Sequence, residues 1–217
     1  MKIGIIGAGN VGVGLGKRLA AKGHDIVVSF SRTAAGVAEA AQRIGGGARA
    51  ATPQAAAIHG DVVIVATPWG VTLSAVGDIA AELAGKIVWD TTNPLKADMS
   101  GLEIGLSTSA GEEIAKLATG ARVVKAIPPF AEVLHSSSTH IAGARPSVFV
   151  CGDDADARAS VLKLVADVDA DGIDSGPLRL ARYTEPLGML FVQLAYVQGF
   201  GTRIGASFIQ DRAPGSD

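Results

Sequence analysis

The stretch that decides the fold is KIGIIGAGNVGVGLGKRLAAKGHDIVVSFSR, residues 2–32. An apolar run opens it, a helical pattern follows, and a second apolar run comes after that. Between the first run and the helix lie three glycines spaced G-x-G-x-x-G: Gly7, Gly9 and Gly12. In this context Gly7 allows a tight turn, Gly9 lets a pyrophosphate approach the backbone, and Gly12 lets the helix pack on the strand. The helix N-terminus adds N–H groups that favour an anion. The sequence therefore predicts a dinucleotide site.

The end of the second apolar run indicates which dinucleotide binds. About twenty residues beyond the glycines, proteins that bind NAD carry Asp or Glu for the ribose hydroxyls. Here the chain has Ser31 and Arg32, followed by Thr33. A guanidinium pairs with a dianion and hydroxyls donate to phosphate oxygens, whereas a carboxylate would repel a phosphate. These three residues therefore predict NADP(H), through its 2′-phosphate.

The rest of the chain alternates short apolar runs with helical patterns. Further strands are predicted at residues 61–68, 86–94, 121–129, 147–153 and 168–174, with helices at 73–85, 111–120 and 154–168. Such repetition is typical of the α/β class, with a doubly wound parallel sheet of the NAD(P)-binding Rossmann type. Helices then cover both faces, and the ligand crevice lies at the carboxyl ends of the strands.

The chain reads as one domain with an appended helix. No linker rich in proline, serine or charge divides it, so residues 1–178 are predicted to form the NADP-binding Rossmann domain. Residues 179–217 form a C-terminal helical segment, in which the tail from Arg179 to Phe208 reads as one long apolar helix. Its apolar face is larger than a monomer usually exposes, which predicts contact with the substrate pocket and a homodimer.

Composition excludes several classes of function. The net charge of -2 gives no basic patch for nucleic acid or a membrane surface, and no apolar segment is predicted to span a bilayer. The single cysteine, Cys151, lies in an apolar run and reads as a buried strand thiol. His135 and His140 bracket a polar loop without a third ligand, so no metal site is predicted. With no basic leader, a cytoplasmic location is expected.

Residues after the later strands are predicted to line the reactive half of the crevice. They are Thr67, Pro68 and Trp69, then Thr92, Asn93 and Pro94, then the run from Ala126 and Ile127 to Phe130. These loops are apolar and rich in proline, so they form a rigid, partly dry wall. No Tyr-x-x-x-Lys motif or His–Asp pair supplies a positioned acid, so no catalytic residue is assigned. Hydride transfer between two rings needs alignment more than an acid, which favours a flavin-like partner.

Several motifs together resemble one family. They are the glycine stretch, the Pro-Trp of ATPWG, DTTNPL, VVKA, VCGDDADAR, DSGPLRLARYTEPL and GFG, and they run from residue 1 to about 208. The chain resembles the NADPH-dependent reductases of the deazaflavin coenzyme F420. The resemblance implies hydride transfer between the nicotinamide and the deazaflavin, and a homodimer formed partly through the C-terminal helix.

The resemblance also implies individual contacts. It places Gly7, Gly9, Asn10, Val11, Ser31 and Arg32 on NADP, and Pro68, Trp69 and Asn93 beside the nicotinamide. Two stretches depart from the family pattern: KAIPPF, residues 125–130, and SFSR, residues 29–32. Both bear on the second substrate more than on NADP.

Other acceptors stay open at this point. An NADPH-dependent flavin reductase shares every feature so far, and so does an orphan NADP(H)-binding oxidoreductase or sensor. A sensor is expected to have Pro128, Pro129 and Phe130 filling the second pocket. A pyrroline-carboxylate-type reductase is disfavoured, because it needs a helical domain of about a hundred residues and only some forty remain after the sheet.

Overall fold

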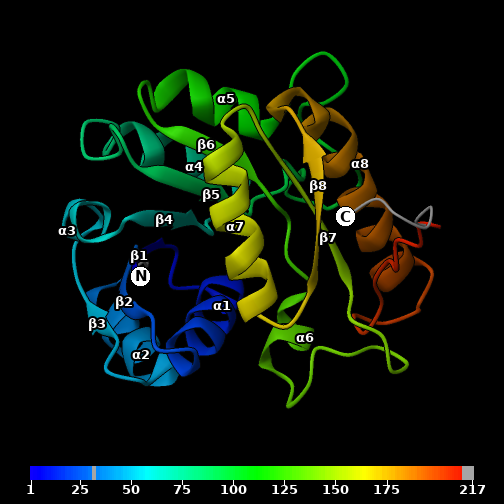
Figure 1. Ribbon diagram of the computed structural model, residues 1–217, viewed down its shortest axis with the longest axis horizontal. Coiled ribbons are helices and arrows are strands. Elements are labelled where there is room, and N and C mark those ends of the chain that lie inside the picture. The colour runs from blue at the N-terminus through cyan, green and yellow to red at the C-terminus, as the bar shows by residue number, and fades with distance from the viewer. Residues whose placement is uncertain (31–32, 212–217) are drawn as a thin grey trace.

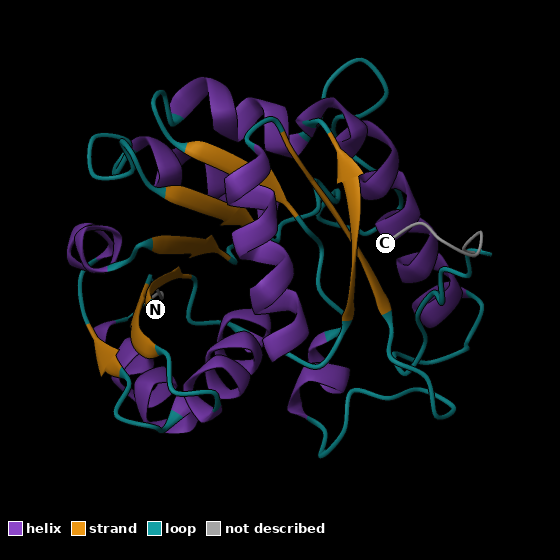
Figure 2. Cartoon of the chain, in the orientation of Figure 1, coloured by secondary structure: helices purple, strands orange, loops and turns teal. Residues whose placement is uncertain are grey.

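The computed structural model describes residues 1–30 and 33–211. They form one sheet flanked by helices (Figures 1 and 2). The strands are β1 Lys2–Ile6, β2 Asp25–Ser29, β3 Arg49–Ala50, β4 Val62–Val65, β5 Ile87–Asp90, β6 Arg122–Lys125, β7 Ser147–Gly152 and β8 Asp171–Gly176. The α-helices are α1 Asn10–Ala21, α2 Ala34–Ile44, α3 Pro53–His59, α4 Trp69–Gly77, α5 Ala110–Leu117, α6 Ala131–His135, α7 Ala155–Asp167 and α8 Ala181–Val192.

The sheet has the predicted Rossmann arrangement. Its strand order is β3-β2-β1-β4-β5-β6-β7-β8, and β1 to β6 are all parallel. The order reverses between β1 and β4, which places a crevice at their carboxyl ends. The predicted α/β fold is therefore confirmed.

The last two strands depart from the expected parallel sheet. β7 runs antiparallel to β6, and β8 is parallel to β7. The connection between β6 and β7 contains only the five-residue helix α6. Residues 126–146 are enough for a crossover, but α6 is too short a helix to run back along the sheet, so the chain enters β7 from the carboxyl end of β6 and runs in the opposite direction.

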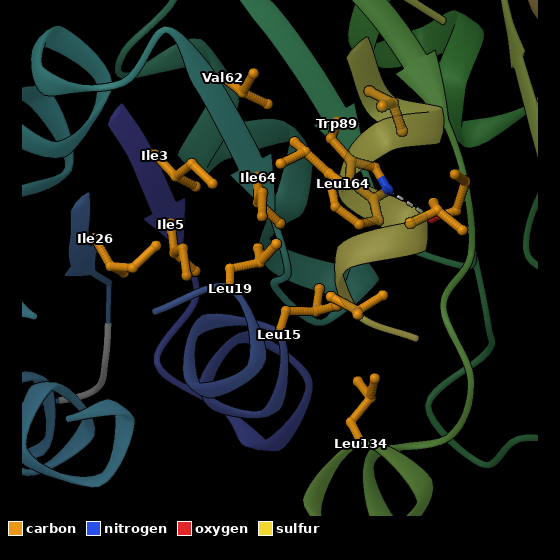
Figure 3. Close-up of a cluster of buried hydrophobic side chains, with 14 of the residues drawn as sticks. Ile3, Ile5, Leu15, Leu19, Ile26, Val62, Ile64, Trp89, Leu134 and Leu164 are labelled. Atoms are coloured by element: carbon orange, nitrogen blue, oxygen red, sulfur yellow. Dashed lines mark hydrogen bonds between the residues drawn. The ribbon is translucent and has the colours of Figure 1, made fainter. Parts of the chain in front are cut away.

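Two apolar cores, one on each face, hold the layers together. Side chains alternate along each strand, so Ile3 and Ile5 point to one face and Ile6 to the other. The first face packs against α1, α2 and α7, and Figure 3 shows Leu15, Leu19 and Leu164 meeting it there. The second face packs against α3, α4 and α5.

The helix predicted at residues 73–85 has different bounds in the structure. It begins earlier, at Trp69, because Pro68 caps it and Thr72 Oγ1 donates to the Pro68 carbonyl at 2.9 Å. It ends at Gly77 and continues as turns.

The long C-terminal helix ends before Phe208. α8 continues into a π-helical turn, η2 Gln193–Val197, and stops there. Gly199 and Gly201 both have φ of +74°, a conformation that ends a helix and suits glycine. The following chain runs beside β7, where Ser147 N donates to the Ala206 carbonyl at 2.8 Å. Across residues 1–30 and 33–211, no helix combines the length and apolar character that crossing a bilayer requires.

Candidate functional site

A cleft of about 710 Å³ opens at the carboxyl ends of β1, β4, β5 and β6. The turn before α1 forms one end of it. The loops after β4, β5 and β6 form its sides, and α8 with its π-helical turn closes the other end. This volume suits a drug-sized ligand or the reacting halves of two cofactors.

The cleft collects most of the residues predicted from the sequence. Its lining includes Gly9, Asn10, Val11, Thr67, Pro68, Trp69, Asn93 and Ile127. Gly7 lies in the turn after β1 and Gly12 in the first turn of α1, both outside this lining, and Ala126 is fully buried. Thr33 is the N-cap of α2, where its Oγ1 accepts from Gly36 N at 3.1 Å. Ser31 and Arg32 lie outside the described residues.

The geometry of the glycine turn fits a dinucleotide pyrophosphate. Gly7 has φ of +135°, and a Cβ on it would collide with the Ala66 carbonyl. A Cβ on Gly12 would collide with the Gly7 carbonyl, so this position needs glycine for packing. Gly9 differs, because a Cβ there would meet nothing within 4 Å. The fold therefore leaves open space at Gly9, beside the free N–H groups of the first turn of α1.

Asn93 offers a second sign of fit. Its side chain lines the cleft, and its Oδ1 is buried without a hydrogen-bond partner among residues 1–30 and 33–211. A buried amide oxygen is costly to leave unpaired, so a ligand N–H at this point would satisfy it. The carboxamide of a nicotinamide carries such a donor.

One wall of the cleft is apolar. Ile127, Pro128, Pro129 and Phe130 line it from the loop after β6, facing Phe191 and Tyr196. The rings of Phe130 and Tyr196 meet edge to face, with centroids 6.1 Å apart. The proline-rich loop therefore forms a wall and leaves the cleft open beside this wall. A sensor was expected to have these residues filling the second pocket.

A buried ion cluster lies directly behind this cleft, and the sequence reasoning missed it. Lys125 Nζ is 2.6 Å from Asp90 Oδ2 and 3.0 Å from Glu185 Oε1, and all three side chains are fully buried. We call Asp90, Lys125 and Glu185 the buried ion cluster. Burial lowers the pKa of Lys125, but the two carboxylates outweigh it and the pKa lies above the usual value. Burial raises the pKa of Glu185, against the opposing effect of Lys125.

One signal in the sequence could have revealed part of this cluster. Asp90 ends the apolar strand β5, Lys125 follows two buried valines at the end of β6, and the two are register partners. A charge at the end of a buried strand requires a partner. Glu185 could not be added by this reasoning, because its position depends on how α8 docks.

Cys151, predicted to be a buried strand thiol, is buried and free. Burial raises its pKa to about 12, so the thiol is protonated at neutral pH.

Comparison with known proteins gives consistent results. Residues 2–94 match the family model described as NADP oxidoreductase, coenzyme F420-dependent. The F420-dependent NADP reductase of Methanocaldococcus jannaschii is 30% identical over 207 residues, which cover 89% of this chain and 92% of that protein. The rat metalloreductase STEAP3 is 29% identical over 197 residues, 87% of this chain but 37% of its own length.

A solved structure agrees along the whole chain. The crystal structure of a proposed F420-dependent NADP reductase from Arthrobacter sp. FB24 superposes with a TM-score of 0.86 at 28% identity. The match covers 97% of this chain and all of that one.

Proposed function

This chain belongs to the family of coenzyme F420-dependent NADP oxidoreductases, and we propose that it transfers a hydride between NADP(H) and coenzyme F420. Members of this family are NADP-dependent oxidoreductases, and this chain is one of them. The acceptor is the part that goes beyond the family, because relatives near 30% identity include both F420-dependent reductases and a metalloreductase.

One observation supports a ring acceptor: a single cleft joins the glycine turn to an apolar wall. Gly9 to Val11 line this cleft together with Pro128, Phe130 and Phe191. Two flat rings placed face to face in such a cleft need no acid, because a hydride passes directly between two carbons.

The residues of the chain then act by binding and excluding water. The turn at Gly9 and the N-terminus of α1 hold the pyrophosphate, and Asn93 accepts from the carboxamide. NADPH supplies the hydride from its nicotinamide. Trp69 and the proline-rich loop keep the surroundings apolar, which limits loss of the hydride to solvent.

The acceptor is tested by direct turnover. Purified protein is mixed with NADPH and, in separate reactions, with F420, FMN or FAD, while absorbance at 340 nm is followed. We expect oxidation with F420 at a rate well above that with either flavin. Faster oxidation with FMN or FAD would identify a flavin reductase instead. No oxidation with any ring, together with tight NADPH binding, would favour a sensor.

The 2′-phosphate preference is tested at Arg32. We expect Arg32→Ala to weaken NADPH binding by about 1.5–3 kcal/mol, because one charge-assisted hydrogen bond is lost, and to leave NADH binding nearly unchanged. Titration calorimetry with both cofactors measures the difference. Arg43→Ala is the matched control, since this exposed arginine lies in the last turn of α2. An equal loss for both cofactors at Arg32 would contradict the prediction.

We also propose a homodimer formed through the C-terminal segment. Large apolar side chains are exposed along it: Tyr183, Leu190, Tyr196, Val197, Phe200, Phe208 and Ile209. Light scattering is expected to give twice the mass of one chain, and Leu190→Glu with Val197→Glu is expected to give the monomer, because each places a charge in the apolar contact. A wild-type monomer at micromolar concentration would rule this dimer out.

A further inference from the structure

The buried ion cluster fixes the backbone of one cleft-lining residue, Thr92. Lys125 Nζ donates to the Thr92 carbonyl at 2.7 Å. Asp90 Oδ1 accepts from Thr92 N at 2.8 Å and from Thr92 Oγ1 at 2.7 Å. Both peptide groups of Thr92 are thereby held, and the second of them leads directly into Asn93.

Folding alone does not explain such a cluster. Three ionisable side chains are fully buried, and apolar residues of similar size usually stabilise a core as well or better. The cluster also lies at one particular place, where β5 and β6 end behind the cleft. A role in setting the geometry of that edge accounts for both the burial of the three charged side chains and their position behind the cleft.

Glu185 extends the same control to α8. Its carboxylate accepts from Ala110 N at 3.0 Å and from Gly111 N at 3.2 Å, at the start of α5. Three residues further along α8, Gly188 lines the cleft against Asn93, since a Cβ on Gly188 would lie 2.8 Å from Asn93 Nδ2. Asn93 is thus bounded by two elements that the cluster ties together.

We propose that Lys125 is a positioning residue for the nicotinamide half of NADP(H), acting through Thr92 to hold Asn93 in the cleft. It touches neither the cleft nor its contents, because its ammonium is enclosed by Asp90, Glu185 and Thr92. The inference requires that NADP(H) binds with its nicotinamide beside Asn93. It does not depend on which acceptor reacts.

The test compares two nucleotides that differ only in the nicotinamide. NADPH and 2′-phospho-ADP-ribose, which lacks the ring, are titrated against wild type and Lys125→Met by calorimetry, with thermal unfolding measured in parallel. We expect the variant to bind NADPH about tenfold more weakly, the size of one lost hydrogen bond, and 2′-phospho-ADP-ribose within about twofold of wild type.

A second variant covers a failure to fold. Lys125→Met alone leaves two buried carboxylates without their cation, which is strongly destabilising. The double variant Lys125→Met with Asp90→Asn removes one charge of each sign and so keeps the net charge of the cluster. It still frees the Thr92 carbonyl, and we expect the same selective loss of NADPH affinity.

Glu112→Gln is the matched control. Glu112 on α5 forms a two-pronged ion pair with Arg182 on α8, at 2.7 and 2.9 Å, so it also ties these helices together without touching Thr92. We expect it to lower the melting temperature and leave the ratio of the two affinities unchanged. The proposal is overturned if the Lys125 variants weaken both nucleotides equally or neither, if Glu112→Gln changes the ratio as they do, or if neither Lys125 variant folds.

Discussion

Replacing Gly9 with valine is expected to weaken NADPH binding at least about 100-fold, roughly 2.7 kcal/mol, while the protein stays folded. Gly9 has φ of −82° and ψ of −174°, an extended conformation that valine adopts readily. Its Cβ position faces open space, which is where the pyrophosphate must approach the N–H groups of α1. A branched side chain would occupy this space. Titration calorimetry measures the binding, and circular dichroism measures the fold.

Two other glycines separate this effect from damage to the fold. Gly12→Ala is expected to lower stability itself, because its Cβ would collide with the Gly7 carbonyl. Gly77→Ala is expected to leave NADPH binding unchanged and, if anything, to raise stability slightly, since a Cβ at this end of α4 meets nothing within 4 Å and lies outside the cleft. If Gly9→Val bound NADPH like wild type, the pyrophosphate would have to lie elsewhere.

Local chemistry explains what the sequence could predict. Short stretches of sequence determine the tight turn at Gly7, the packing at Gly12 and the alternation of strands and helices. The structure confirms the fold that these features predicted. The direction of β7 was mispredicted, because it depends on whether residues 126–146 form a helix long enough to run back along the sheet, and their loops and short helix have no strong sequence pattern. The end of α8 was misjudged because glycines at 199 and 201 were read as helical.

In the candidate site, too, the sequence predicted what depends on local pattern and missed what depends on how distant elements pack. Residues at strand ends, such as Thr67 and Asn93, lie at the cleft because parallel strands bring their carboxyl ends to one edge, and their contact with the cofactor stays a prediction. The buried ion cluster was missed because Glu185 meets Lys125 only after α8 docks on the sheet. The assignment of Ser31 and Arg32 to the 2′-phosphate lies outside the described residues and stays a prediction.

Trp89 is expected to be the side chain whose truncation costs most stability. It is fully buried in the core beneath α7, and its indole Nε1 donates to the Ala126 carbonyl at 2.8 Å, the dashed line in Figure 3. We expect Trp89→Ala to lower the free energy of unfolding by about 3–5 kcal/mol, because it leaves a large cavity. The measurement is urea unfolding followed by circular dichroism, since removing a tryptophan alters fluorescence.

Trp89→Phe separates packing from the hydrogen bond. Phenylalanine fills much of the same space but leaves the Ala126 carbonyl, at the base of the cleft wall, without its donor, so we expect a smaller loss of about 1–3 kcal/mol. Ile58→Ala is the control, because Ile58 is 64% exposed and its truncation is expected to stay within about 0.5 kcal/mol. If Trp89→Ala lowered the free energy of unfolding no more than Ile58→Ala does, the prediction would be contradicted. The core would then have to repack around the missing ring, and the buried ion cluster alone would fix the position of the carboxyl end of β6.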